Sequence, residues 1–406
     1  MRCHFVHRKL WIMVKRQYHI ILFIFGFLYY LIVPPLVVSS RSWEDYPGMH
    51  NLYMYYKDGY MSDYFLYIIF VGFFFLSGSF ASSLSHNPYK IVKSNRVVRS
   101  KSLFIISMPL FLYCQLLILQ NRGSLFQGYL VEVDAPFVGT IASASMFYLF
   151  MFIYNKSGIY SKGISKMLIV ILLELSIVLM GLGSRMYVFI IFISILVYYL
   201  DMNIISLRKL LLYGGLGALF VLAIGIWRQG GTNITMEGLV YIGVAEPTYT
   251  WISAISMYDM NTLPLFAFPY NFISSFLNFI PHVLLPNKSE LISDVALQYD
   301  APLGALNIIV SLISNFGILG SLVAIFLLGY LLTYIRLHWQ TIFGQTYYYC
   351  VCGVIPFQLF RDPFTVVNKA FFSNLLLVPL LFILLSRILK GLLNTKPVGD
   401  FNKENI

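Results

Sequence analysis

Residues 180–189 read MGLGSRMYVF, and they interrupt an apolar run that extends from Met167 to Leu200. That run is longer than the roughly 20 residues with which a helix crosses the hydrocarbon core of a bilayer. Glycine and serine at its middle are typical of a turn between two helices. We therefore predict a hairpin of two membrane helices, with Arg185 at the membrane–water boundary rather than at the bilayer centre, where a charge is costly.

The composition of the whole chain agrees with membrane insertion. Of its 406 residues 59% are hydrophobic and 11% are charged, whereas soluble domains carry roughly 25% charged residues. The net charge of +11 does not indicate a nucleic-acid partner, because the basic residues flank apolar runs instead of forming one patch. The cysteines lie in the N-terminal tail or in apolar runs, so we expect neither a disulfide framework nor a metal site (Cys3, Cys114, Cys350 and Cys352).

The hydropathy pattern predicts an all-α polytopic membrane protein with about ten transmembrane helices. The first apolar stretch is too long for the core of a signal peptide, so it is expected to remain as the first helix. The predicted spans are 19–40, 64–83, 103–120, 137–154, 167–182, 186–201, 210–227, 313–335, 346–360 and 367–386.

Charge asymmetry assigns the sides of the membrane. Twenty of the 28 Lys and Arg residues lie in the N-terminal tail, the C-terminal tail and the even-numbered gaps, while 13 of the 17 acidic residues lie in the odd-numbered gaps. By the positive-inside rule both termini are cytoplasmic, an N-in/C-in topology. The chain then divides into a basic tail, seven helices, one long outer loop, three helices and a second tail (1–18, 19–227, 228–312, 313–386 and 387–406).

Three arginines lie at the outer ends of predicted helices, although arginine is scarce on that side. They are Arg185, Arg228 in GIWRQGG and Arg361 in LFRDPF. Each of them can be an anchor that reaches the lipid headgroups. Because three occur at the same depth, we favour a shared anionic ligand, for which the planar guanidinium is well suited.

The long outer loop is rich in aromatic and acidic residues. Phe268, Phe272, Phe276 and Phe279 recur at helical spacing, which predicts a helix in the membrane interface whose rings pack on the membrane domain. A large outer loop favours an enzyme over a transporter, because an enzyme acting on a lipid-linked substrate must hold its headgroup and exclude water.

The order of these features resembles the Wzy-type family of oligosaccharide repeat-unit polymerases, which build O-antigen or capsule. The outward arginine in GLGSR is followed by a helix ending in WRQGG and by the loop stretch FIPHVLLPNK, which is similar to a Pro-x-x-Leu-x-Pro-x-Lys pattern of that family. The next helix begins SNFGILGSLVAIFLLG, similar to the family's Asn-Phe-Gly entry into a glycine-spaced helix. The resemblance covers about residues 165–335, and the arginine-to-glycine spacing of some members is not matched after Arg185 or Arg228.

The resemblance implies a function. Such an enzyme transfers a glycan from undecaprenyl diphosphate onto a new lipid-linked repeat unit, at the outer face of a bacterial cytoplasmic (inner) membrane. It implies no metal and no other cofactor, no nucleic acid, and as partners the lipid-linked oligosaccharide, the bilayer and a protein that regulates chain length. The diphosphate would be bound by Arg185, Arg228, Arg361 and Lys288.

Glycosyl transfer also needs a base for the acceptor hydroxyl. Glu246 in VAEPTYTW and His282 in IPHVL are the candidates in the outer loop, although Glu246 could instead pair with an outer arginine and His282 could be a packing residue. Glu174 lies within the fifth predicted span, where a carboxylate is either functional or fixes helix packing.

Three other functions remain open at this point. A flippase for the same lipid would need cations lining a cavity between two related halves, and the sequence contains no internal repeat. A metal-dependent membrane glycosyltransferase would use an acidic motif in the first outer loop, which Glu44 and Asp45 supply. An O-antigen ligase shares the long late loop with a polymerase.

Overall fold

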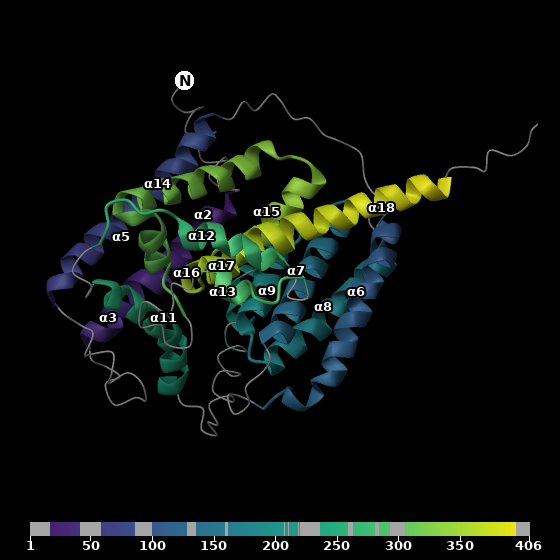
Figure 1. The fold of residues 1–406 in the computed structure, drawn as a ribbon, viewed down its shortest axis with the longest axis horizontal. Coiled ribbons are helices and arrows are strands. Elements are labelled where there is room, and N and C mark those ends of the chain that lie inside the picture. The colour runs from purple at the N-terminus through teal and green to yellow at the C-terminus, as the bar shows by residue number, and fades with distance from the viewer. Residues whose placement is uncertain are drawn as a thin grey trace, which may run out of the picture.

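The computed structural model describes residues 17–40, 58–85, 100–127, 135–158, 161–206, 208–209, 211–217, 219, 236–258, 263–280, 284–292 and 305–394. Within these ranges the chain is helical and contains no strand. Figure 1 shows α6, α7 and α8 gathered on one side of the molecule, with α3, α5 and α14 on the other. Helices α7, α9 and α15 pack against one another.

The first half of the chain forms the helices α2 (Tyr18–Phe27), η1 (Leu28–Ile32), α3 (Val33–Ser40), α5 (Asp58–Leu84), α6 (Ser100–Gln120), η2 (Arg122–Ser124), α7 (Ala135–Ser157), α8 (Lys162–Gly181) and α9 (Arg185–Asp201). The second half forms α11 (Met236–Tyr258), α12 (Tyr270–Ser274), η3 (Ser275–Phe279), α13 (Lys288–Leu291), α14 (Ile308–His338), α15 (Ile342–Val354), α16 (Gln358–Arg361), α17 (Phe364–Asn368), η6 (Lys369–Leu377) and α18 (Val378–Asn394). Segments η1 and η6 are π-helical, while η2 and η3 are 3₁₀ helices.

Seven helices in the described part of the chain are long and apolar enough to cross a membrane, so this is a multi-pass membrane protein. They are Tyr18–Ser40, Met61–Leu84, Lys101–Gln120, Phe137–Ser157, Lys162–Gly181, Ile308–His338 and Phe364–Leu389. The sixth predicted span coincides with α9 and the ninth overlaps α15, helices that have only 17 and 13 residues. The predicted span 210–227 lies mostly outside the described residues. The count of about ten therefore stays a prediction.

The predicted hairpin is confirmed as two helices that break at GLGS. Helix α8 ends at Gly181 and α9 begins at Arg185. Between them Gly183 has φ 82, a conformation in which glycine avoids the clash of a Cβ atom. The Gly183 N–H donates to the Met180 carbonyl at 2.9 Å and the Ser184 N–H to the Leu179 carbonyl at 2.7 Å, which is a Schellman motif. Arg185 is thereby fixed as the first residue of α9.

The segment predicted as a long outer loop contains a helix that packs deeply in the molecule. Helix α11 contacts α3, η1 and α14, and its Trp251 and Ala254 are fully buried. The four phenylalanines do not form one regular helix, because α12 covers five residues and continues as the 3₁₀ segment η3. Phe272 packs against Phe316 and Phe364, which agrees with the predicted packing of that ring on the membrane domain.

Helix α14 begins five residues before the predicted start and is broken inside. Gly317 has φ 72 and ψ 177, so the helical hydrogen-bond ladder is interrupted at the Asn-Phe-Gly sequence. The N–H groups of Ile318 and Leu319 donate instead to the carbonyls of Pro264 and Leu265, at 2.9 and 3.0 Å. A Cβ at residue 317 would overlap the backbone of Leu265, so glycine is required there both for space and for conformation.

Candidate functional site

The candidate site begins with two adjacent tyrosines on the π-helical segment η1. Tyr29 donates its hydroxyl hydrogen to the carbonyl oxygen of Gly243 in α11. That carbonyl would normally accept from the N–H four residues later, but residue 247 is Pro247, which has no N–H. The first membrane helix therefore satisfies the carbonyl that the proline leaves free, and the two helices are fixed at this level.

Glu246, the residue before that proline, lies between two arginines. Its Oε2 is 3.4 Å from Nη2 of Arg185, and its Oε1 is 3.1 Å from Nε of Arg361. The Tyr30 hydroxyl donates to the same Oε1 at 3.3 Å. Four side chains from η1, α9, α11 and α16 thus meet at the end of the α8–α9 hairpin.

The position of Arg361 is set by its own backbone and by the rings beside it. The Arg361 carbonyl accepts from the Leu306 N–H at 2.7 Å, just before α14 begins. Phe357, four residues earlier, stacks on Phe189 with ring centroids 5.0 Å apart and contacts the edge of the Tyr29 ring. Phe357 thus packs against rings of both α9 and η1.

The ionic cluster is partly open to its surroundings. The side chains of Arg185, Glu246 and Arg361 are 20%, 23% and 26% exposed, and the ion-pair distances are longer than those of tight pairs. Asp362 adds a second carboxylate 3.6 Å from Nη1 of Arg361. Burial raises the pKa of Asp362, while Arg361 opposes that rise. When both carboxyl groups are ionised, the two arginines and two carboxylates of the cluster are formally neutral together.

The structure brings together three of the six residues predicted for the site, namely Arg185, Glu246 and Arg361. Lys288 begins α13 and donates to the Ile280 carbonyl at 2.8 Å, and burial lowers its pKa. Arg228 and His282 lie outside the described residues.

The other sequence candidates do not add a metal centre to the described residues. Glu44 and Asp45 lie outside those residues, while Glu174 is half-buried on α8. The cysteines Cys114, Cys350 and Cys352 are buried and unbridged. Where the structure is described, no group of three or more His, Cys, Asp or Glu residues could hold a metal ion.

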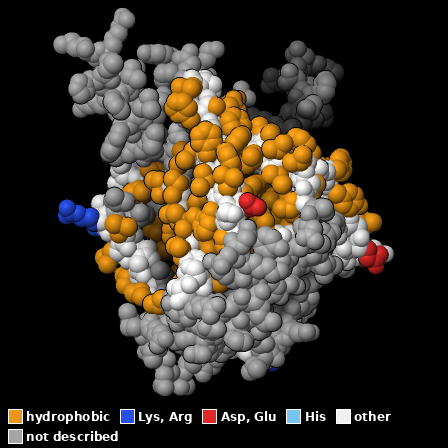
Figure 2. Space-filling model, turned by 90° about the vertical axis from the view of Figure 1, so that its left-hand side faces the viewer, with side chains coloured by type: hydrophobic (Ala, Val, Ile, Leu, Met, Phe, Trp, Pro, Cys, Tyr) orange, Lys and Arg blue, Asp and Glu red, His pale blue; other side chains and the backbone are white. Residues whose placement is uncertain are grey.

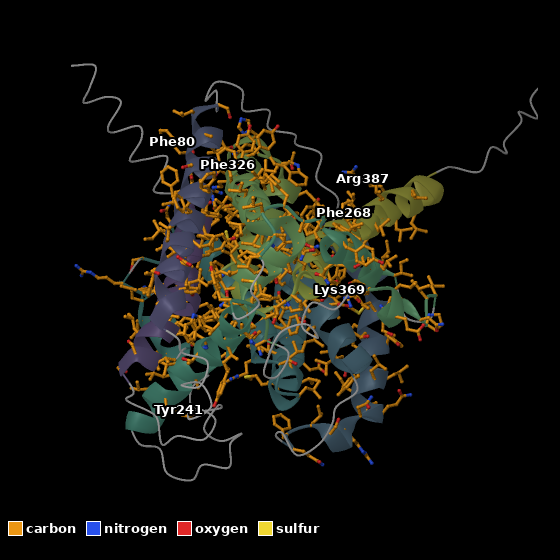
Figure 3. All side chains as sticks on the ribbon, turned by 60° about the vertical axis from the view of Figure 1, so that its left-hand side comes forward. Phe80, Tyr241, Phe268, Phe326, Lys369 and Arg387 are labelled. Atoms are coloured by element: carbon orange, nitrogen blue, oxygen red, sulfur yellow. The ribbon has the colours of Figure 1, made fainter. Side chains whose placement is uncertain are left out.

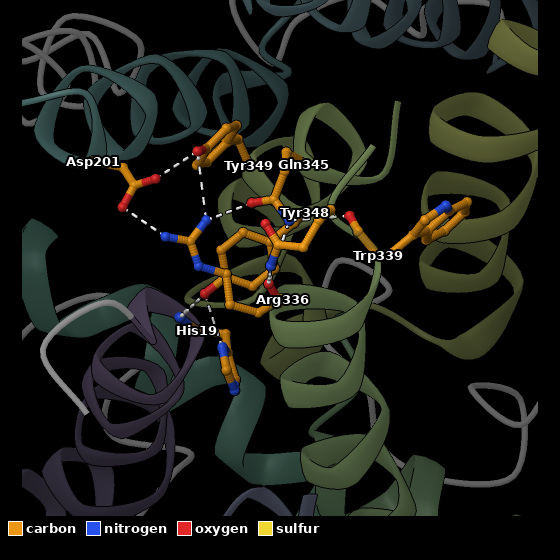
Figure 4. A network of polar contacts seen from close by, with 8 residues as sticks. His19, Asp201, Arg336, Trp339, Gln345, Tyr348 and Tyr349 are labelled. Carbon is orange, nitrogen blue, oxygen red and sulfur yellow. Dashed lines mark hydrogen bonds and ion pairs between the residues drawn. The ribbon is translucent and has the colours of Figure 1, made fainter. Parts of the chain in front are cut away.

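Sequence reasoning missed a second charged network, shown in Figure 4. Nη2 of Arg336 in α14 lies 2.6 Å from Oδ1 of Asp201 at the end of α9, and these side chains are only 9% and 7% exposed. Tyr349 donates to the other Asp201 oxygen at 2.5 Å, and Arg336 donates to Gln345 at 2.6 Å. The Arg336 guanidinium also lies over the Tyr348 ring, 5.0 Å from its centroid.

The network continues to His19 on the first helix. The His19 ring shares hydrogen bonds of 2.9 Å with the Tyr348 hydroxyl and with the Thr333 hydroxyl. Asp201 and Arg336 are 135 residues apart, and each follows an apolar run, so the sequence shows them only as separate charges at helix ends. The network joins α2, α9, α14 and α15 and holds them in one arrangement.

Comparison with family models, curated proteins and solved structures finds no match to this chain. The site must therefore be interpreted from its own geometry.

Proposed function

We propose that this protein is a membrane glycosyltransferase that joins undecaprenyl-diphosphate-linked oligosaccharide repeat units into O-antigen or capsular polysaccharide. The observation that carries the proposal is the cluster in which Glu246 lies between Arg185 and Arg361. The proposed topology is the predicted one, with about ten spans and both termini in the cytoplasm. The cluster then lies at the outer face of a bacterial cytoplasmic membrane, where flipped lipid-linked glycans arrive.

The reaction requires stabilisation of a leaving diphosphate. The bond between the anomeric carbon of the growing chain and the diphosphate oxygen breaks, and its electron pair stays on that oxygen. Arg185 and Arg361 stabilise the charge that develops there, since prearranged cations are most effective where charge appears in the transition state. The acceptor hydroxyl oxygen bonds to the anomeric carbon, and its proton passes to Glu246.

Glu246 has two roles in this scheme, which follow each other in time. Without substrate it occupies the space between the arginines as a resident anion. The diphosphate carries more negative charge and can form bidentate bonds with guanidinium groups, so it displaces the carboxylate. The released carboxylate remains on α11 beside the bound headgroup, where it can accept the proton.

The contrast between the two charged networks supports this exchange. Arg336 and Asp201 are buried, and their charged atoms lie 2.6 Å apart. Tyr349 also donates to Asp201 and Arg336 donates to Gln345, as expected for a fixed structural pair. The contacts of Glu246 are 3.1–3.4 Å long and partly exposed, as expected for a pair that opens. Arg228 and Lys288 remain further candidates of this proposal for binding the diphosphate, and His282 remains a candidate for the base.

A transporter of the same lipid is the second candidate, because α14 is interrupted at Gly317. Helices broken within the membrane are typical of transporters, where they form substrate sites. An O-antigen ligase would use the same chemistry at the outer face with another acceptor.

The test is replacement of Arg185 and Arg361 by alanine, one at a time, in cells that lack the native copy. Arg122→Ala is the matched control, because Arg122 is an exposed arginine on the same predicted side. Surface glycan is resolved by size on a gel, and the amount of each variant in the membrane is measured.

The proposal expects Arg185→Ala and Arg361→Ala to reduce a long ladder to a single repeat unit, while Arg122→Ala keeps the ladder. Loss of all surface glycan, with lipid-linked units accumulating inside, would indicate the transporter. Free long chains that fail to reach their final acceptor would indicate the ligase. An unchanged ladder in both variants would leave the arginines as lipid anchors.

A further inference from the structure

Helices α5 and α14 touch closely along one half of their length and separate along the other. A Cβ atom at Gly78 would overlap the Phe326 carbonyl oxygen, and one at Gly329 would overlap the Phe75 carbonyl oxygen. Small residues that allow such close approach are typical of helix pairs in membranes. Figure 3 shows Phe80 and Phe326 near one end of the molecule and Tyr241 of α11 at the opposite end. The close contact therefore lies toward the end farther from Tyr241.

Beyond the contact, a groove opens between these two helices. It has a volume of about 740 Å³, within the range of ligand pockets, about 300–1,000 Å³. Its walls come from α5, from both sides of the Gly317 break in α14, and from Tyr258 and Leu263. Its apolar lining includes Leu66, Phe70, Phe74, Ile313, Ile318 and Leu319.

The groove opens onto a surface that lipid covers. Both α5 and α14 contain candidate membrane spans, and Leu66 and Leu319 at the groove are 56% and 45% exposed. Figure 2 looks at the side of the molecule where α5 lies and shows hydrophobic side chains spread over its described surface. Hydrocarbon fills an apolar groove at this depth, because water has few partners there.

The polar groups of the groove limit which lipid fits. The Tyr67 hydroxyl is within 2.6 Å of the Ser321 hydroxyl and is thus already occupied. Asp63 is the charged residue of the lining and lies near the predicted outer boundary. A phospholipid seated in the groove would bring its phosphate toward this carboxylate, and the like charges would repel.

A lipid whose diphosphate is bound elsewhere avoids this repulsion. Tyr258 at the groove and Glu246 in the ionic cluster lie on the same helix, twelve residues or about 18 Å apart along its axis. We propose that the α5–α14 groove binds the hydrocarbon chain of the polyprenyl-linked substrate whose diphosphate lies between Arg185 and Arg361. This inference rests on the proposed function and adds where the lipid chain is held.

The experiment compares a long and a short polyprenyl diphosphate on the purified full-length protein. Undecaprenyl diphosphate and farnesyl diphosphate share a headgroup, and only the long chain reaches from the arginines into the groove. Leu319→Trp fills the groove, and Leu66→Trp does so from the opposite wall. Leu327→Trp is the matched control, because Leu327 is an exposed leucine of α14 two turns farther on and outside the groove.

The wild type should bind undecaprenyl diphosphate more tightly than farnesyl diphosphate. Each groove variant should weaken undecaprenyl diphosphate binding by about tenfold, equivalent to displacing about two methylene groups, and leave farnesyl diphosphate unaffected. Leu327→Trp should change neither affinity. Thermal unfolding of all variants checks that the tryptophans are tolerated.

Two results would overturn the groove assignment alone. One is equal affinity of the wild type for the two diphosphates, and the other is binding of both diphosphates by the groove variants with wild-type affinity. The assignment would also be overturned if mass spectrometry finds a phospholipid bound to the wild type but not to the groove variants, while the variants still bind undecaprenyl diphosphate as the wild type does. Failure of the wild type to bind either diphosphate would overturn the proposed function and this inference with it.

Discussion

Replacing Asp201 by asparagine tests the structural role of the buried network around Arg336. The substitution keeps the shape of the side chain but leaves the Arg336 charge, only 9% exposed, without its carboxylate. Removing one partner of a buried ion pair costs about 3–5 kcal/mol of stability. Glu246→Gln is the matched comparison, because its pairs are partly exposed and contribute about 0–1 kcal/mol.

Unfolding of the purified protein in mixed micelles, with increasing denaturing detergent, gives the assay. Tryptophan fluorescence reports on both regions, because Trp251 is fully buried in α11 and the Trp339 carbonyl accepts a bond from Gln345 in the network. Asp201→Asn should lower the unfolding midpoint clearly, whereas Glu246→Gln should shift it little. Equal losses in the two variants would refute the distinction between a fixed and an exchangeable pair.

Three further predictions concern other contacts. Tyr29→Phe should lower stability by about 0.5–1.5 kcal/mol, because the part-buried Gly243 carbonyl in α11 loses its donor. Adding Pro247→Ala should restore part of that stability, as a double-mutant cycle would show. Gly78→Ala should destabilise the folded protein by about 1–3 kcal/mol, because its Cβ overlaps α14. Gly163→Ala is the control and should not destabilise it, because the space around that Cβ is open; the same unfolding assay measures both. Asp362→Asn should be as stable as the wild type in acid and more stable than the wild type as the pH rises to neutral. The reason is that a raised carboxyl pKa favours the folded protein only while that group is protonated. A stability difference between the two proteins that narrows with rising pH would contradict this.

Local rules were sufficient to predict the α8–α9 hairpin from sequence. A run too long for one span, with glycine and serine at its middle, predicts the break. Only the structure shows that Gly183, and not Gly181, adopts positive φ. The same rules predicted that Arg185 and Arg361 belong to helix ends. They could not predict that both arginines meet Glu246, because that contact depends on how α9, α11 and α16 pack, and Arg185 and Glu246 are 61 residues apart.

The buried position of α11 was not predictable from hydropathy. Glu246, Pro247 and two threonines lower its mean hydropathy, so it resembles a loop. In the structure Tyr29 of η1 donates to its Gly243 carbonyl, and Thr250 donates to the Glu246 carbonyl within the helix. The break in α14 was missed for a related reason. Gly317 in an apolar run looks like any small packing residue. Only the structure shows that the next two N–H groups, of Ile318 and Leu319, donate to the carbonyls of Pro264 and Leu265.

The central claim is that Arg185 and Arg361 hold an anion whose place Glu246 occupies in the free protein. Its most direct test is titration of the purified protein with inorganic diphosphate, comparing the wild type with Arg185→Ala, Arg361→Ala and Glu246→Gln. The account predicts that each alanine variant weakens binding and that Glu246→Gln strengthens it, because the competing carboxylate is gone. Weaker binding by Glu246→Gln, or binding that does not depend on either arginine, would contradict the account.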